Sequence, residues 1–364
     1  MDILQWIFAV FAIIGAVDRI IGNKFQLGEE FEKGIVASGT LSLAMVGMIC
    51  IAPSVAKLLE PVFAPVSAAT GIDMSFIGSF IANDMGGAAI SSALAGDATL
   101  GGFNGLVVAS MLGATVCFTV PVALKMIKKE YHKDVLSGIL CGIATMPVGC
   151  IVSGLMLGVG FGRLMLNLLP VLIVAVITCI GLILKPDLCR KIFGLIGSFV
   201  MVVITVGLAA GIFSHLTGKT LIPYMSPVKD AFAIVADVAI ILAGVFPLIK
   251  VISLIFGKLF AAAGKKIGVD ETSVLGLISS LAYSIPTFEM AENMNSKGRM
   301  MNMAFAVSAS FVFGDHLAFT MSFDKRFLWA VIAGKLICGV CAVVAAVFMY
   351  KFTYKKAKKK GCRI

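Results

Sequence analysis

A carboxylate and a helix-breaking pair of glycines stand together inside an apolar part of this chain. In the stretch FIANDMGGAAISS, Asp84 follows Asn83 and precedes Gly86 and Gly87. A carboxylate at such a break can hold a cation through charge-assisted hydrogen bonds, and the neighbouring amide can bind a hydroxyl group. The alternative is structural, because Asp and Asn also cap helices. We predict that Asp84 and Asn83 bind a small cationic substrate.

A second apolar segment, AYSIPTFEMAENM, carries a similar set of groups after its own break. Pro286 interrupts the helical pattern, and Thr287 and Glu289 follow it. Thr287 offers a hydroxyl and Glu289 a second carboxylate, so we predict that both join the same site. Glu292 lies nearer the end of the segment, where we expect a solvated or paired charge.

A third polar pair, Asp315 and His316, occurs in FVFGDHLAFT. Adjacent residues of a helix point in different directions, so the two need not contact one ligand. His316 is equally explained as a hydrogen-bonded helix contact or as a proton-linked group. We include both residues in the predicted substrate site.

The composition places these residues in a membrane protein. Hydrophobic residues make up 59% of the 364 residues and charged residues 14%, and the mean hydropathy is +1.03. These values lie far outside the range of soluble domains. Buried ionisable groups in membrane helices are functional by default. Lys250 and Lys335, however, we expect to extend toward the lipid headgroups.

Long apolar runs predict the helices that position these groups, since about 20 residues cross the hydrocarbon core. The fold class expected is all-α, with about nine spans and two interrupted pieces that form re-entrant hairpins. The nine spans are 3–20, 34–57, 104–125, 134–157, 164–184, 191–214, 230–256, 301–320 and 328–350, and the hairpins are 75–95 and 274–293. Asn104 and Asn302 start spans in this scheme, and we expect them to be N-caps.

The distribution of charge sets the predicted orientation. The net charge of +10 comes from short loops and from the tail YKKAKKKGCRI, which is the positive-inside pattern of a membrane protein. The C-terminus is therefore expected in the cytoplasm, and no nucleic-acid partner is expected. Two hairpins that each enter and leave by one face keep the lysine-rich loop 125–133 inside.

The two halves of the chain repeat the same order of segments. Gly78 precedes Asn104 by the same distance as Gly276 precedes Asn302. We predict an inverted-topology repeat, with residues 1–157 as the first repeat, 158–190 as a linking helix, 191–350 as the second repeat and 351–364 as a basic tail. Secondary transporters bind substrate at the interface of such repeats.

Several classes of protein are disfavoured. The chain lacks the G-x-x-x-x-G-K-[ST] run of nucleotide-binding loops and the H-E-x-x-H and G-x-S-x-G motifs of hydrolases. We therefore expect neither an enzyme nor a bound cofactor or metal. The nine cysteines lie mostly in apolar runs and do not indicate a disulfide framework.

The stretches FIANDMGGAAISSALAG, YSIPTFEMAENM and FVFGDHLAFT together resemble the EutH family of bacterial ethanolamine-utilisation permeases. The resemblance implies a multi-pass protein of the bacterial inner membrane that imports ethanolamine for catabolism, chiefly when external acid keeps the amine protonated. It supplies the substrate, which the residue pattern alone does not, and it transfers no residue roles.

The expected function is thus import of ethanolamine as the protonated cation, by a uniporter or proton-influenced carrier. Two alternatives stay open: a cation-coupled transporter of another small polar solute such as a nucleoside, and a channel for ammonium-like cations. Ethanolamine and the lipid bilayer are the expected partners, and homo-oligomerisation is left open.

Overall fold

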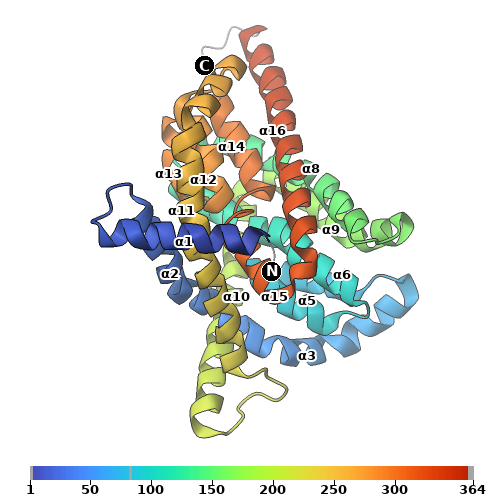
Figure 1. Ribbon diagram of the computed structural model, residues 1–364. Coiled ribbons are helices and arrows are strands. Elements are labelled where there is room, and N and C mark those ends of the chain that lie inside the picture. The colour runs from blue at the N-terminus through green and yellow to red at the C-terminus, as the bar shows by residue number, and fades with distance from the viewer. Residues whose placement is uncertain (1–2, 82–83, 360–364) are drawn as a thin grey trace.

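The computed structural model describes residues 3–81 and 84–359, and these residues form helices and no β-strand (Figure 1). The prediction of an all-α polytopic membrane protein is confirmed. Within the described residues, eight helical stretches are long and apolar enough to cross a membrane. They are Ile3–Ile20, Leu27–Thr70, Ala98–Met126, Lys129–Met156, Phe161–Leu184, Pro186–Thr217, Val228–Phe260 and Asp315–Phe352.

The named elements divide these stretches further. α1 is Ile3–Ile20, α2 is Leu27–Leu41, α3 is Gly47–Thr70, α6 is Ala98–Gly102, α7 is Val120–Met126, α8 is His132–Met156, α9 is Phe161–Leu184, α10 is Pro186–Thr217, α11 is Val228–Ile267, α15 is Asp315–Asp324 and α16 is Leu328–Lys359. Between α6 and α7 the chain forms two wide π-helical segments, Phe103–Gly113 and Thr115–Thr119. Every residue of the first is buried.

The predicted span 301–320 is wrong as a single helix. α14 (Ser296–Ser308) ends there, residues 309–314 form turns, and α15 starts at Asp315. Phe311 in this break has φ +63°, a left-handed backbone conformation that is rare for a bulky residue. Its N–H donates to the Ser280 carbonyl at 2.9 Å. Hydrogen bonds to another segment thus stabilise the break. A hydropathy profile contains no information about such contacts, so it could not predict the break.

The second interrupted piece is broken between α12 (Glu271–Ala282) and α13 (Ile285–Met290), close to Pro286 as the sequence predicts, whereas Asn83 of the first piece lies outside the described residues. The first piece consists of α4 (Gly78–Ile81), a turn at Asp84–Gly86 and α5 (Gly87–Leu94). Pro286 lies in the first turn of α13. The arms of each piece pack on one another: the Ser91 hydroxyl donates to the Ser75 carbonyl, and the Thr287 hydroxyl to the Gly276 carbonyl, both at 2.8 Å.

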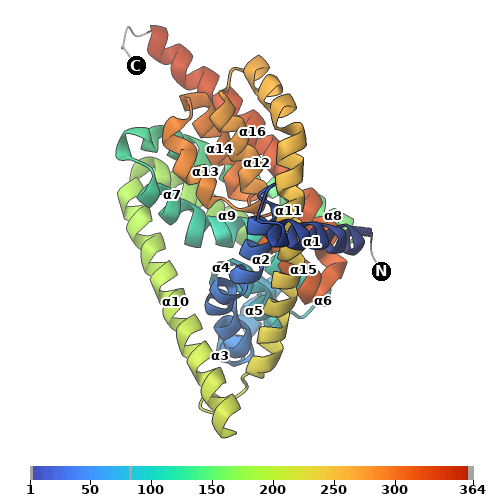
Figure 2. The same ribbon diagram turned by 60° about the vertical axis from the view of Figure 1, so that its left-hand side comes forward.

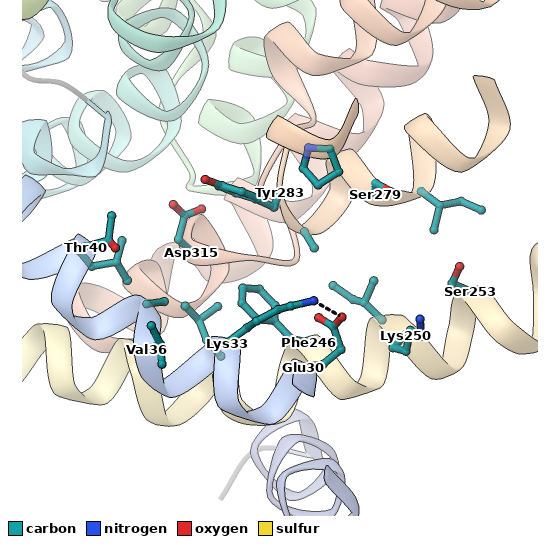
Figure 3. A pocket seen from close by; sticks show the side chains of 17 residues that line it. Glu30, Lys33, Val36, Thr40, Phe246, Lys250, Ser253, Ser279, Tyr283 and Asp315 are labelled. Atoms are coloured by element: carbon teal, nitrogen blue, oxygen red, sulfur yellow. Dashed lines mark hydrogen bonds and ion pairs between the residues drawn. The ribbon is translucent and has the colours of Figure 1, made fainter. Parts of the chain in front are cut away.

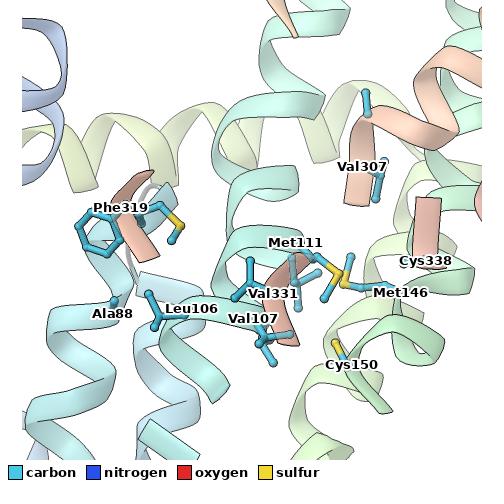
Figure 4. Close-up of a cluster of buried hydrophobic side chains, with 14 of the residues drawn as sticks. Ala88, Leu106, Val107, Met111, Met146, Cys150, Val307, Phe319, Val331 and Cys338 are labelled. Carbon is cyan, nitrogen blue, oxygen red and sulfur yellow. The ribbon is translucent and has the colours of Figure 1, made fainter. Parts of the chain in front are cut away.

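The core of the molecule lies where α8 packs between α14 and α16. A Cβ atom on Gly149 would lie 2.5 Å from the Gly334 carbonyl oxygen, so only glycine allows α8 and α16 to approach this closely. Figure 4 shows the buried side chains around this contact, with Met146 of α8 near Cys338 of α16. The same view places Phe319 of α15 beside Ala88 of the first hairpin.

A separate group of helices, α1, α2 and α11, covers another side of the molecule. α1 lies across α11 in both views (Figures 1 and 2). Glycines permit these crossings, since a Cβ on Gly244 would lie 2.1 Å from the Phe8 carbonyl oxygen and one on Gly34 would lie 2.5 Å from the Ala243 nitrogen. α2 and α11 together form one wall of the main pocket.

Candidate functional site

The first hairpin is fixed at its base by a buried aspartate. The Asp73 carboxylate accepts the Ser75 N–H at 2.9 Å and the N–H groups of Gly96 and Asp97 at 3.1 Å each. Asp73 thereby caps the entering arm and also holds the exit from the returning arm. Deeper in, the Asn104 side-chain amide donates to the Ser75 hydroxyl at 2.8 Å.

The second hairpin is fixed by the same kinds of residue. The Asp270 carboxylate accepts the Ser273 N–H at 2.8 Å and the Asn295 N–H at 2.6 Å. The Asn302 amide donates to the carbonyl oxygens of Ser273 at 2.8 Å and Gly298 at 2.9 Å. An acid at the entrance and an asparagine in the following helix therefore clamp each hairpin.

The predicted N-cap roles of Asn104 and Asn302 are wrong. Both lie within helices, and the caps come earlier in the chain: Asp97 accepts from the Thr99 and Leu100 N–H groups, and Asn295 accepts from the Gly298 N–H. The helices start before the hydrophobic runs that marked the predicted boundaries. The side-chain amides of the two asparagines therefore donate hydrogen bonds to the hairpins instead of capping helices.

The break 309–314 meets the end of α12. The Phe311 N–H donates to the Ser280 carbonyl at 2.9 Å, and the Phe313 N–H donates to the Leu281 carbonyl at 2.8 Å. The last carbonyl groups of a helix have no partner within it. The two broken segments thus satisfy each other's backbone groups.

The main pocket opens beside this crossing and has a volume of about 630 Å³. Its walls come from α2, α11, the break after α12 and the first residue of α15. Figure 3 shows Asp315 and Tyr283 close together at one end of the pocket, and the Lys33–Glu30 ion pair of 2.7 Å toward the other. The polar lining residues are Glu30, Lys33, Thr40, Lys250, Ser253, Ser279, Tyr283 and Asp315.

Asp315 is the first residue of α15, where the helix dipole stabilises a negative charge. Tyr283 is 47% exposed and lies close to Asp315 in the pocket lining (Figure 3). A carboxylate beside a phenol provides an anionic acceptor for an ammonium group and a donor or acceptor for a hydroxyl. The pocket end therefore has the chemistry to bind a small amino alcohol.

A cluster of rings packs around Phe311, next to Tyr283 of the pocket lining. The Phe311 ring lies 5.8 Å from the rings of Tyr283 and Phe118 and 5.2 Å from that of His316, centroid to centroid. His316 is fully buried and lies behind Phe311 rather than on the pocket surface. Asp315 and His316 point to different environments, as neighbours on a helix are expected to do.

The remaining predicted site residues do not line the main pocket in the part of the chain that the structure describes. Asn83 lies outside the described residues, and Asp84 is described only through its backbone, which begins the turn Asp84–Gly86. Thr287 is buried and its hydroxyl donates to the Gly276 carbonyl. Glu289 is exposed and does not line the pocket. Of the described candidates, Asp315 alone is in the pocket lining.

Sequence reasoning did not select Tyr283 or Thr40, and it misplaced Lys335. Tyr283 lies in the break between α12 and α13, three residues before Pro286, which was an available signal; Thr40 stands in an ordinary apolar helix and gave none. The prediction that Lys335 reaches the headgroups is wrong, because the residue is 1% exposed and its Nζ donates to the Ser110 carbonyl at 2.8 Å. Glu292 is paired as expected, with Lys128 at 2.7 Å.

Comparison with known proteins gives a consistent result. The model of the family described as ethanolamine utilisation protein, EutH, matches residues 1–349. The chain is 44% identical to a Listeria monocytogenes protein named probable ethanolamine permease EutH, over 99% of this chain and 96% of that one. It is 39% identical to the Bacillus subtilis protein YxeR, named uncharacterized (99% and 97%), and 35% identical to a Salmonella typhimurium protein named probable ethanolamine permease EutH (96% and 95%). No solved structure matches the chain.

Proposed function

Because the chain belongs to the EutH family of ethanolamine-utilisation proteins, we propose that it carries ethanolamine across the bacterial inner membrane as the protonated amine. The family and its named permeases make the chain a membrane transporter rather than an enzyme. Neutral ethanolamine can cross lipid unaided, whereas the ammonium form carries a large desolvation penalty. A carrier is needed mainly for the cation.

The observation that carries this proposal is that Asp315 and Tyr283 lie together in the lining of the pocket beside two broken helices (Figure 3). In the proposed complex the substrate ammonium binds the Asp315 carboxylate. The hydroxyl end binds Tyr283 or the nearby Thr40. A pocket of about 630 Å³ far exceeds the volume of ethanolamine, so we take it as a vestibule whose inner end is the binding site.

The other predicted residues keep subordinate roles in the proposal. Asp84 and Asn83 are proposed to complete the cation site when the carrier changes state. Thr287 positions the second hairpin, and Glu289 lies near enough to Tyr283 to attract cations toward the pocket. His316 packs against the Phe311 ring and has a positioning role in the proposal.

Alternating access is the mechanism that we propose, with the two hairpins in an inverted-topology repeat. Support comes from the matching clamps of Asp73 and Asp270. Support also comes from an ion pair next to each hairpin. Asp97 pairs with Arg163 at the start of α9. Glu292 pairs with Lys128 just before α8. These contacts lie toward opposite ends of α8. The basic tail puts the C-terminus in the cytoplasm in this arrangement.

Uptake of labelled ethanolamine by proteoliposomes tests the proposal. Saturable uptake that persists at acidic external pH and shows counterflow exchange supports a carrier for the cation. Uptake that does not saturate indicates a channel, and preference for a nucleoside over ethanolamine indicates a different substrate. Chemical conversion of ethanolamine by purified protein would indicate an enzyme.

A further inference from the structure

A lysine that the proposed substrate site does not use lies buried among the central helices. Lys335 stands seven residues after the start of α16, about 10 Å along the helix axis. Trp329, near the start of the same helix, is 61% exposed, whereas Lys335 is 1% exposed. The side chain therefore points into the protein, away from lipid and headgroups.

One partner of Lys335 is a main-chain oxygen in the first half of the chain. Nζ donates to the Ser110 carbonyl at 2.8 Å, and Ser110 lies in the buried π-helical segment Phe103–Gly113. An ammonium group thus joins α16 to the helix that follows the first hairpin.

Carbonyl oxygens of irregular membrane helices are the groups that hold coupling cations in secondary transporters. An ammonium ion and an alkali ion carry the same charge, and each can be bound by such oxygens. A buried charge is costly unless it is needed and compensated. A lysine at a carbonyl of this kind supplies a permanent cation at a place where a mobile ion would otherwise have to bind.

We propose that Lys335 is a tethered internal cation that replaces a coupling alkali ion between the two halves of the carrier. The ammonium group holds the Ser110 region against α16 without any ion from solution. Transport by the natural chain should then need no Na⁺ or K⁺. The inference deepens the proposed transport function, on which it rests for its activity readout.

The first test uses the unaltered protein in proteoliposomes. Uptake of ethanolamine should be the same within about twofold in media of Na⁺, K⁺ or bulky N-methylglucamine. Uptake that rises tenfold or more with Na⁺ and saturates would overturn the proposal, because a mobile ion would then be required. This measurement does not depend on any variant folding.

The second test removes the charge. Lys335→Met and Lys335→Ala should lower uptake at least about tenfold, while Lys57→Met, an exposed lysine of α3 that pairs with Glu60, serves as the matched control. In Lys335→Ala, Na⁺, K⁺ or methylammonium should restore uptake at least about fivefold over N-methylglucamine. Near-normal uptake by Lys335→Met, or a folded Lys335→Ala protein that responds to none of these cations, would contradict the inference.

Thermal unfolding in detergent separates this inference from the transport proposal. A small cation that fills the vacated position should raise the apparent Tm of Lys335→Ala by about 2 °C or more, with no matching rise in the unaltered protein. This readout holds even if the transported solute is not ethanolamine. An equal effect of the cations on both proteins would count against a site at position 335.

Discussion

The guanidinium of Arg299 and the carboxylate of Asp134 form a buried ion pair, with Nη1 2.8 Å from Oδ2 and side chains only 4% and 8% exposed. Arg299 also donates to the Ala291 and Met294 carbonyls and lies 3.9 Å from the centre of the Tyr131 ring. One side chain thus ties the second hairpin, α14 and the first turn of α8 together. The base of this hairpin is rigid, so movement during transport should be confined to its tip or involve α8 as well.

Breaking this pair should strongly destabilise the protein. We expect Arg299→Met to lower the free energy of unfolding by about 3–5 kcal/mol, because it leaves the Asp134 carboxylate buried without its partner charge. The exposed pair of Arg326 and Asp324 provides the control, and Arg326→Met should cost less than about 1 kcal/mol. Thermal or denaturant unfolding in detergent measures both. Equal losses would show that Arg299 contributes no more than a surface charge.

Asp315→Asn should weaken ethanolamine binding roughly tenfold to hundredfold, since charge-assisted hydrogen bonds contribute about 1.5–3 kcal/mol. The substitution keeps the shape of the side chain, so folding should be retained. Binding to purified protein and uptake at matched membrane abundance measure the effect. Glu60→Gln, which removes an exposed acid of α3, is the control. Wild-type affinity in Asp315→Asn would exclude the pocket end as the cation site.

Asp84→Asn separates two roles for the first hairpin. If Asp84 binds the substrate cation, we expect binding to fall roughly tenfold to hundredfold. If it only caps the returning arm, Asn should serve nearly as well, and transport should stay close to normal. The same binding and uptake assays decide between them. A normal Asp84→Asn protein would leave Asp315 as the main acid.

Acid should weaken the base of the first hairpin through Asp97. The Leu100 N–H and the Arg163 guanidinium hold the pKa of the Asp97 carboxyl below its ordinary value, against the opposing effect of burial. A depressed pKa contributes stability that is complete above about pH 4 and is lost as the pH falls through the folded-state pKa. The Tm of the unaltered protein should therefore fall more steeply below about pH 4 than that of Asp97→Asn. Parallel curves would show that Asp97 has no part in acid sensitivity.

Cysteine labelling can test the opposed hairpins. Thr99→Cys follows the base of the first hairpin, and Lys297→Cys follows the base of the second. An impermeant thiol reagent added to intact cells should label position 99 from outside and position 297 only after the membrane is opened. The unaltered chain gives the background from its own cysteines. Labelling of both positions from the same side would rule out the inverted repeat.

The sequence by itself determined the class of this protein and the location of the helix break near Pro286. An excess of apolar residues sets the solvent in which the chain folds, and Pro286 acts on the backbone locally, so neither depends on distant contacts. The family resemblance, carried by short stretches around these breaks, supplied the substrate. The family match over residues 1–349 bears it out.

Tertiary structure alone decided where the polar side chains point and which of them meet. The break at 309–314 is stabilised by carbonyl groups of α12, and Asn104 and Asn302 bind hairpins far along the chain. Lys335 is buried because Ser110, more than two hundred residues away, offers it an oxygen. Hydropathy predicts how deep in the membrane a residue lies but not the direction in which its side chain points. That direction depends on which helices pack together.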